Sequence, residues 1–382
     1  MKQQRDSVVN SSFAGQRPSR IAVVGGGIAG LTCARHLILS GYEAVVFEAD
    51  QRLGGRCSSL STPVGLFDDG AQCISDASKL AGLVEQRPGE LAALHPWTVA
   101  ATPAEEDRLA KRWKKDEDEA DVTRTLKPMG AVGVPSMLAL AQALARPLEV
   151  RLNTPIVRVR RRGATWLLSS PAQMIEEEFQ ALVLAIPAPL AMPLLGESPT
   201  LSDAMRSVRY RSRWVLLLGT ERPVALSSYR VFQGSPIERV AAMHSKPGRP
   251  ASASQRWFIE ADERWSEQHA HEDAETVAQL LLDNFQAHAG RSVKPSFIRA
   301  QQWRHALVET PVVTYRRNEC LWDAVACLGV CGDSVVASQL DRVQRSGADM
   351  ARVVAESLNW RKARNGPSAF AQGSGRVLEA HL

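Results

Sequence analysis

Three glycines near the start of the chain have the spacing of a phosphate-binding turn. Gly25, Gly27 and Gly30 follow an apolar run at residues 21–24 and give the pattern G-x-G-x-x-G between a predicted strand and a predicted helix. The first glycine permits a tight turn, the second lets the backbone approach a pyrophosphate, and the third lets the helix pack closely on the strand. The pattern predicts that the chain binds a dinucleotide.

An acidic residue completes this motif. The helix is expected to run to about Ser40 and to stop at Gly41, and a second strand is predicted at residues 44–47. Glu48 follows that strand, where a carboxylate accepts hydrogen bonds from both ribose hydroxyls of an adenosine. A lone glycine pattern is weak evidence, but here strand, glycines, helix, second strand and acid appear in order.

The residues after Glu48 point to the kind of dinucleotide. Gly54-Gly55-Arg56 comes just past the second strand, and an NAD dehydrogenase needs no such element. This arrangement resembles the flavoprotein amine oxidase superfamily, and the resemblance implies that Arg56 lies against the pyrophosphate of FAD. A guanidinium matches phosphate oxygens bidentately and keeps its charge when partly buried. FAD is therefore the predicted cofactor, although a solvated loop cation is the alternative reading of Arg56.

The C-terminal part of the chain supports the same resemblance. An apolar run at residues 327–330 precedes Cys331-Gly332-Asp333. The resemblance implies that this strand returns to the nucleotide domain and that Asp333 bonds the ribityl chain; an ordinary helix N-cap is the alternative for Asp333. It also implies that the following helix, which carries Ser346 and Gly347, aims its N-terminus at the flavin. A helix N-terminus stabilises negative charge that develops there.

Between its ends the chain is similar to the renalase-like branch of bacterial FAD oxidoreductases. The similarity rests on residues 67–72, 133–137, 166–168 with 185–189, and 302–307, and with the terminal motifs it covers about residues 20–355. Members often show His-Arg where this chain has Gln301 and Gln302. They often show Glu and a small Ala where it has Asp341 and Val343.

The predicted site has a cofactor side and a substrate side. The cofactor-binding residues are expected to be Gly25, Gly26, Gly27, Ile28, Ala29, Gly30, Glu48, Ala49, Gly54, Gly55, Arg56, Gln72, Ile156, Gly332, Asp333 and Val343. On the substrate side, Trp303 and Tyr315 are candidates for stacking on a substrate, with core packing as the alternative for Trp303. No catalytic side chain is predicted, because the flavin carries the chemistry.

The predicted fold is of the α/β class, with a Rossmann-like FAD-binding domain interleaved with an α+β substrate domain built on a mixed or antiparallel sheet. The FAD-binding domain is expected at residues 20–75, 130–192 and 320–360, the substrate domain at 76–129 and 193–319, a disordered lead-in at 1–19 and a mobile tail at 361–382. Within these, residues 128–135 are predicted to be a loop, followed by a helix at 136–145 with Ser136 as its N-cap.

Composition narrows the class of protein further. The chain has 382 residues, of which 45% are hydrophobic and 23% charged, as in a globular enzyme. Its net charge of +5 does not predict a nucleic-acid partner, because Lys and Arg alternate with Asp and Glu. No apolar run is long enough to span a bilayer, and residues 1–19 lack the apolar core of a secretory signal, so the cytoplasm is the expected location. The six cysteines and eight histidines show no metal-ligand spacing, and no metal is predicted.

Three functions are compatible with these residues. The first is an oxidase that takes a hydride from a reduced nicotinamide-type nucleotide and passes the electrons to oxygen, giving hydrogen peroxide. The second is an amine oxidase or desaturase acting on a small amine or apolar substrate. An amine would have to reach the flavin as the free base, in a desolvated pocket. The third is a non-catalytic flavin-binding redox sensor or partner protein, as the departures at Gln301, Gln302 and Val343 would allow.

Overall fold

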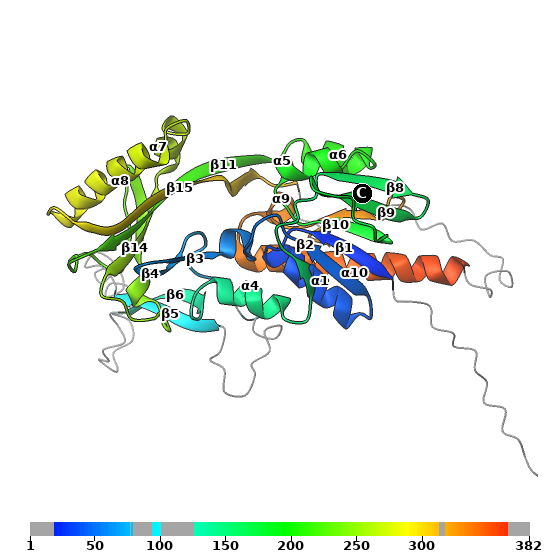
Figure 1. The fold of residues 1–382 in the computed structure, drawn as a ribbon, viewed down its shortest axis with the longest axis horizontal. Helices are drawn as coiled ribbons and strands as arrows, with labels where there is room; N and C mark the ends of the chain where they lie inside the picture. Colours follow the sequence, from blue (N-terminus) through cyan, green and yellow to red (C-terminus); the bar gives the residue numbers. More distant parts are fainter. Residues whose placement is uncertain (1–18, 77, 79–93, 101–125, 313–317, 366–382) are drawn as a thin grey trace, which may run out of the picture.

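The chain folds into two parts that lie along the long axis of the molecule (Figure 1). The computed structural model describes residues 19–76, 78, 94–100, 126–312 and 318–365. One part is built on a six-stranded sheet and the other on a five-stranded sheet. The predicted lead-in, most of the predicted tail and Tyr315 lie outside the described residues.

The six-stranded sheet contains the predicted nucleotide motif. Its strand order is β16-β17-β10-β1-β2-β7, and every neighbouring pair is parallel except β16 with β17. The strands are β1 (Arg20–Val24), β2 (Glu43–Phe47), β7 (Glu149–Arg151), β10 (Ala181–Leu184), β16 (Leu321–Asp323) and β17 (Leu328–Val330). Helix α1 (Ile28–Leu39) connects β1 to β2. The first strand, the helix and the second strand are thus confirmed to within one or two residues.

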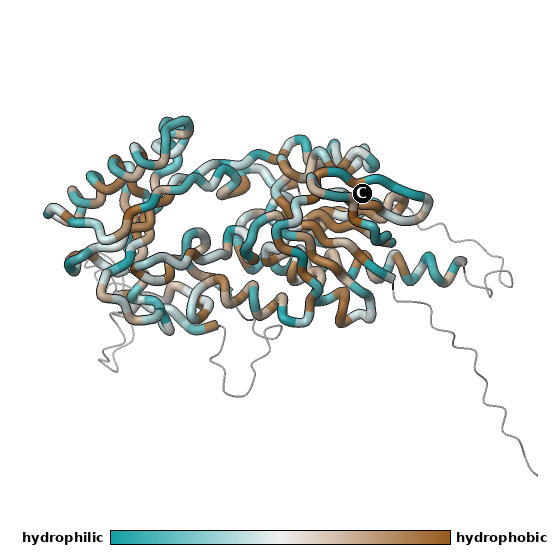
Figure 2. Tube along the Cα trace, viewed as in Figure 1, coloured by the Kyte–Doolittle hydropathy of each residue, from teal (hydrophilic) through white to brown (hydrophobic). Residues whose placement is uncertain are grey.

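Both faces of this sheet are covered, which explains why its strands are apolar runs without alternation. Ile21 and Val23 face α1, α4 (Leu138–Ala145) and α10 (Leu340–Asn365). Ala22 and Val24 face the other way, in a core with the hairpin of β8 (Arg158–Arg162) and β9 (Thr165–Ser169) and with α5 (Ala188–Ala191) and α6 (Pro199–Met205). Figure 2 shows this part largely brown inside and teal outside.

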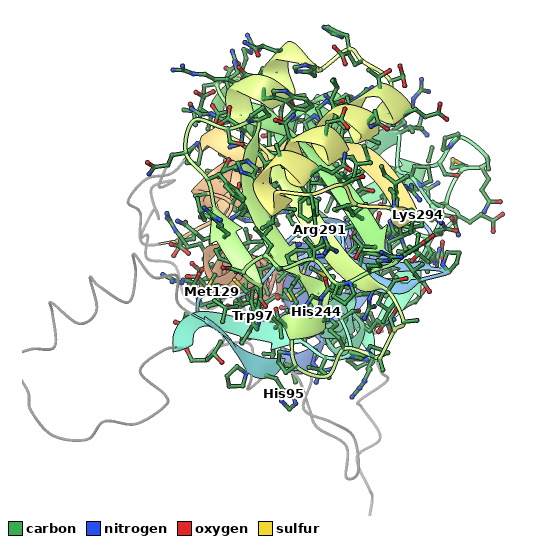
Figure 3. The ribbon with its side chains drawn as sticks, turned by 90° about the vertical axis from the view of Figure 1, so that its left-hand side faces the viewer. His95, Trp97, Met129, His244, Arg291 and Lys294 are labelled. Carbon is green, nitrogen blue, oxygen red and sulfur yellow. The ribbon has the colours of Figure 1, made fainter. Side chains whose placement is uncertain are left out.

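The five-stranded sheet is antiparallel throughout, with the order β12-β13-β14-β11-β15. Its strands are β11 (Arg209–Thr220), β12 (Tyr229–Val231), β13 (Ile237–Ala242), β14 (Gln255–Ala261) and β15 (Pro295–Thr310). Leu216 and Leu218 pack against α7 (Glu263–Gln268) and α8 (Ala274–Ala289), whereas Val215 and Leu217 face the rest of the molecule. Figure 3 looks at this end, with both helices over the sheet.

Two local predictions were wrong around residue 130. Residues 126–133 form a strand, β6 (Leu126–Gly133), paired with β5 (Leu94–Ala100), instead of a loop. Ile74 stabilises β6 by exchanging two backbone hydrogen bonds of 2.8 Å with Ala131. Ser136 does not cap α4, which begins two residues later. Side chains from far upstream bond the amides at its start: Met137 N–H, just before the helix, donates to Asp68 Oδ1 at 2.8 Å, and Leu138 N–H donates to Ser59 Oγ at 3.1 Å.

The predicted tail also began too early, since α10 continues through Asn365. It packs so closely on α1 that a Cβ at Gly347 would lie 2.2 Å from the carbonyl oxygen of Ala29. The remaining short elements are β3 (Ser59–Thr62), β4 (Gly65–Asp68), α9 (Asp333–Val336) and the 3-10 turns η1 (Gly55–Cys57), η3 (Met192–Leu194) and η4 (Met243–Ser245). No helix in the described part of the chain has the length and hydropathy to cross a membrane.

Candidate active site

A cavity of about 950 Å³ runs from the glycine turn of the six-stranded sheet to the inner face of the antiparallel sheet. All of the predicted cofactor-binding residues line it except Gly26 and Gly30, and Trp303 lines it from the opposite side. The structure therefore brings the N-terminal motif, the residues after Gly332 and the substrate-side candidate to one place. Residues 154–156 border the cavity next to Glu48.

The three motif glycines have different roles in the geometry. Gly25 has a φ of 111°, and a Cβ there would lie 2.5 Å from the carbonyl oxygen of Ala185. A Cβ at Gly30 would lie 2.0 Å from the carbonyl oxygen of Gly25, so α1 needs glycine there to reach β1. A Cβ at Gly27 would meet no atom within 4 Å, and Gly27 lines the cavity. It caps α1 without a side chain, so the first amides of the helix are open to a phosphate.

Glu48 is fixed at the end of β2 by backbone amides. Its Oε2 accepts a hydrogen bond of 2.7 Å from Gly26 N–H, and its Oε1 accepts one of 2.9 Å from Asp50 N–H. The carboxylate that is predicted to bind the adenosine ribose therefore has a defined orientation. Gly26 contributes by holding Glu48, although it does not line the cavity itself.

Arg56 lies deep between the two parts of the molecule. Gly54 and Gly55 both have positive φ, 99° and 53°, and the turn they form presents Arg56 to the cavity. Its Nη1 forms an ion pair with Asp333 Oδ2 and donates to the carbonyl oxygen of His305 at 3.1 Å. Burial alone would lower the pKa of Arg56, but the adjacent Asp333 carboxylate outweighs it and raises that pKa.

Asp333 is the centre of a polar cluster that the sequence did not predict. Its carboxylate is buried and also accepts hydrogen bonds from Tyr210 Oη at 3.0 Å and Ser338 Oγ at 3.3 Å. Burial, and then the charge of Asp333, raise the pKa of Tyr210 well above its ordinary value, so the phenol stays protonated. A cation and two hydroxyl donors therefore surround the carboxyl group of Asp333.

His305 lines the cavity beside this cluster. Burial, followed by the positive charge of Arg56, lowers the pKa of its imidazole. Its ring meets the edge of the Tyr210 ring at a centroid distance of 5.3 Å. At neutral pH His305 is therefore a neutral imidazole on the cavity wall.

Trp303 lies on β15. It is half-buried, and its Nε1 donates to the carbonyl oxygen of Asp69 at 2.8 Å. This bond fixes the orientation of the indole against the cavity. Arg304 is exposed and also borders the cavity.

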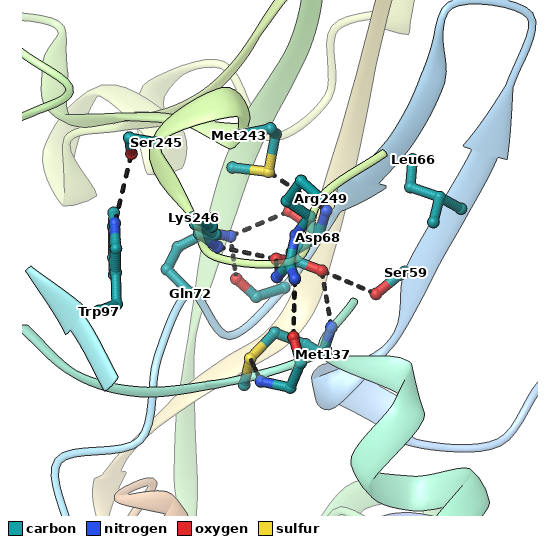
Figure 4. A network of polar contacts seen from close by, with 12 residues as sticks. Ser59, Leu66, Asp68, Gln72, Trp97, Met137, Met243, Ser245, Lys246 and Arg249 are labelled. Carbon is teal, nitrogen blue, oxygen red and sulfur yellow. Dashed lines mark hydrogen bonds and ion pairs between the residues drawn. The ribbon is translucent and has the colours of Figure 1, made fainter. Parts of the chain in front are cut away.

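A buried network of ion pairs contacts the side chain of Gln72 (Figure 4). Asp68 accepts hydrogen bonds from Lys246 Nζ at 2.8 Å and Arg249 Nη2 at 2.5 Å. Burial alone would raise the pKa of Asp68, but these two cations outweigh it and lower that pKa. Gln72 Oε1 accepts from Lys246 at 2.9 Å, and its Nε2 donates to the carbonyl oxygens of Asp68 and Gly70. The side-chain amide of Gln72 thus holds its own loop together.

The antiparallel sheet contributes wall residues that sequence reasoning missed. These are Arg213, Val215, Tyr229, Arg239, Phe258 and Glu260. One signal was available: Glu260 ends a run of apolar residues at 257–259, and a carboxylate in a buried strand requires a partner. That partner is Arg239, whose Nε donates to Glu260 Oε2 at 2.5 Å.

Three cysteines also line the cavity, and two of them, Cys57 and Cys73, have shifted pKa values. Burial and the nearby charge of Asp68 raise the pKa of Cys57 to about 12, and burial raises the pKa of Cys73. Both are free thiols. They are protonated at neutral pH.

Comparison with known families agrees with this geometry. Residues 23–86 match the NAD(P)-binding Rossmann-like domain. Residues 98–319, more than half of the chain, match the model described as flavin containing amine oxidoreductase. The chain belongs to the flavin-containing amine oxidoreductase family. As a member of this family it is an FAD-dependent oxidoreductase.

Curated relatives share parts of the chain. The tRNA 5-methylaminomethyl-2-thiouridine biosynthesis bifunctional protein of Caulobacter sp. (strain K31) is 28% identical over 253 residues, which are 61% of this chain and 40% of that protein. A lysine-specific histone demethylase 1B homolog of Caenorhabditis elegans is 49% identical over 63 residues, 16% of this chain and 7% of that protein. The chain thus spans two-fifths or less of the length of these relatives.

Solved structures share the fold over nearly the whole chain. Cyclohexylamine oxidase from Brevibacterium oxydans IH-35A superposes with a TM-score of 0.63 at 13% identity, covering 90% of this chain and 100% of that one. Putrescine oxidase bound to putrescine superposes with a TM-score of 0.60 at 13% identity, covering 90% and 99%. At these identities the similarity concerns the fold.

Proposed function

We propose that this protein oxidises an amine at the end of the cavity formed by β11, β14 and β15, with oxygen as electron acceptor. The supporting observation is that one cavity continues from the Rossmann glycines to the wall that carries Trp303 and Arg239. In this proposal, residues 20–75, 130–192 and 320–360 hold the cofactor, and residues 76–129 and 193–319 shape the substrate end.

The residues of the cofactor side fit FAD. Gly27 leaves room for a pyrophosphate at the N-terminus of α1, Glu48 faces the adenosine ribose, and Arg56 supplies a fixed positive charge. Asp333 is the partner of Arg56 and the group proposed to bond the ribityl chain. When bound, FAD accepts the hydride of the substrate C–H and returns two electrons to oxygen, which with two protons becomes hydrogen peroxide.

The substrate end has the groups that amine oxidation needs. The amine must be the free base before its C–H can leave as hydride, and the neutral imidazole of His305 brings no negative charge that would favour the ammonium form. Trp303 and Phe258 exclude water from the reacting C–H. A reduced nicotinamide-type nucleotide, the substrate that the sequence favoured by its similarity to renalase-like proteins, is the second candidate. The indole of Trp303 and several arginines of the cavity wall favour it.

A panel of substrates tests this proposal. The holoenzyme is mixed without oxygen with amines and with reduced nicotinamide nucleotides, and the loss of flavin absorbance is followed by stopped flow. Rapid bleaching by amines supports the main proposal, whereas bleaching by nucleotides alone supports the second candidate. If neither class bleaches the flavin, both proposals fail and the redox-sensor alternative gains support.

A further inference from the structure

A row of polar side chains crosses the cavity-facing side of the antiparallel sheet. It runs from Trp303 on β15 through Arg213 on β11 and Glu260 on β14 to Arg239 on β13. The strand register pairs Trp303 directly with Arg213, and Glu260 directly with Arg239. All four residues line the cavity.

Glu260 is already neutralised within this row. Its side chain is only 7% exposed, Oε2 accepts from Arg239 at 2.5 Å, and Arg213 Nε lies 3.5 Å from Oε1. A carboxylate shared by two guanidinium groups has little attraction left for the ammonium group of a substrate. The one acidic residue on this wall therefore does not make the wall a cation site.

Arg213 is nearly buried at the cavity wall and is paired with carboxylates. Its side chain is 7% exposed, and its Nη2 is held by Glu263 at 3.1 Å and Glu238 at 3.3 Å, neither of which lines the cavity. Its buried Nη1 has no hydrogen-bond partner in the described part of the chain. Glu238, Glu260 and Glu263 therefore balance the charge of Arg213, and any attraction for an anion in the cavity falls to Arg239.

Arg239 differs because it is accessible. Its side chain is 34% exposed, and Glu260 accepts from Nε, which leaves the Nη edge of the guanidinium to the cavity. The guanidinium also contacts the hydroxyl of Tyr229, another residue of the cavity wall. Two guanidinium N–H groups and a phenol form a donor set that suits a carboxylate or phosphate.

We propose that the substrate carries an oxyanion, a carboxylate or a phosphate, which binds Arg239 and Tyr229 while the reacting C–H lies near Trp303. This inference rests on the proposed function. Trp303 and Arg239 lie three strand spacings apart across the sheet and two residues apart along it, roughly 16 Å at about 4.8 Å per spacing and about 3.3 Å per residue. Long side chains shorten that span, so the oxyanion lies on the order of 10 Å from the reacting carbon. The substrate is therefore elongated, with its charge remote from the bond that is oxidised.

Matched ligand pairs test the proposal without requiring turnover. Hexanoate is compared with hexanamide, and oxidised nicotinamide mononucleotide with nicotinamide riboside, by titrating the holoenzyme and following flavin absorbance and binding heat. The wild-type protein is expected to bind the anionic member of at least one pair ten-fold or more tightly. Preference within the first pair identifies a carboxylate substrate, and preference within the second a phosphate. Equal binding within both pairs would overturn the proposal.

Variants test whether Arg239 and Tyr229 cause the preference for the anionic ligand. Arg239→Met is expected to remove the preference and leave the neutral members unchanged, while Arg230→Met, an exposed arginine on β12, serves as the control. Tyr229→Phe removes one donor and is expected to weaken the anion several-fold. Should Arg239→Met not fold, Arg239→Met with Glu260→Gln removes both partners of the ion pair. A preference that survives in a folded Arg239 variant and in Tyr229→Phe refutes the site. Failure of all substrates to bleach the flavin would refute the proposed function and leave these binding results valid.

Discussion

The two ends of the cavity are built by different means. At the nucleotide end much of the wall is backbone: glycines 25, 27, 54, 55 and 332 line the cavity in short contiguous segments. At the substrate end the wall is side chains from β11, β12, β13, β14 and β15, which are spread over about ninety residues of sequence. Backbone sites depend on φ and on the lack of a Cβ, which restrict residue type, whereas a side-chain wall depends on strand register.

The largest expected effect comes from the network that fastens the two parts together. Asp68→Asn is expected to destabilise the protein by about 3–5 kcal/mol, because Lys246 and Arg249 would be left as buried cations without a carboxylate. Urea unfolding at pH 7 measures it, and Asp68→Asn with Lys246→Met should recover part of the loss. The pKa of Asp68 is lowered in the folded state, so its contribution is present above the unfolded value of about 3.9 and is lost as the pH falls through the folded pKa. An Asp68→Asn variant that unfolds at the wild-type urea concentration would show the two parts to be joined elsewhere.

A change at Gly30 tests whether the nucleotide end depends on backbone packing. Gly30→Ala places a Cβ 2.0 Å from the carbonyl oxygen of Gly25 and is expected to cost about 3 kcal/mol and to abolish FAD retention. Gly196→Ala is the matched control, because a Cβ there meets nothing within 4 Å. Flavin content after purification and thermal unfolding provide the measurements. Normal flavin content in Gly30→Ala would contradict the packing role of the third glycine.

Removing Arg56 tests how much its charge, as distinct from the backbone, contributes to FAD binding at the nucleotide end. Arg56→Ala is expected to weaken FAD by roughly ten- to a hundred-fold, since a charge-assisted hydrogen bond contributes about 1.5–3 kcal/mol. Arg52→Ala, a nearby half-buried arginine whose Nη1 donates to the carbonyl oxygen of Ser59, is the control. FAD affinity is measured by the recovery of apoprotein fluorescence. Unchanged affinity in Arg56→Ala would mean that the backbone of this turn suffices to hold the pyrophosphate.

The smallest effect is expected at the substrate end. Trp303→Ala should slow flavin reduction about ten-fold, or about 1.4 kcal/mol in the barrier, and leave FAD content unchanged. Its Nε1 bonds Asp69, so Trp303→Phe, which keeps an aromatic ring without that donor, should fall in between. Anaerobic stopped flow with the best substrate of the panel measures the rate. If Trp303→Ala instead loses FAD, the indole supports the cofactor side and the two ends are not separate.

The same contrast explains what the sequence could predict. β1, α1, β2, Glu48 and the turn at Gly54 were predictable because each depends on neighbours within a few residues. Arg239 and Glu260 were not, since their contact depends on the pairing of β13 with β14. The start of α4 was misplaced for a similar reason: Asp68 and Ser59, far upstream in the sequence, accept from the amides at its start, and Ser136 does not. The pairing register of strands that are distant in sequence cannot be read from local composition or periodicity.

The thiols of Cys57 and Cys73 would affect how long an oxidase of the proposed kind survives its own product. A peroxide-forming oxidase exposes its lining to an oxidant at every turnover, and the thiolate, not the thiol, is the form that attacks hydrogen peroxide. Burial keeps Cys57 and Cys73 protonated, and the carboxylate of Asp68 near Cys57 raises the pKa of that thiol further. Two sulfur atoms can thus border the reaction space without offering the oxidant a nucleophile.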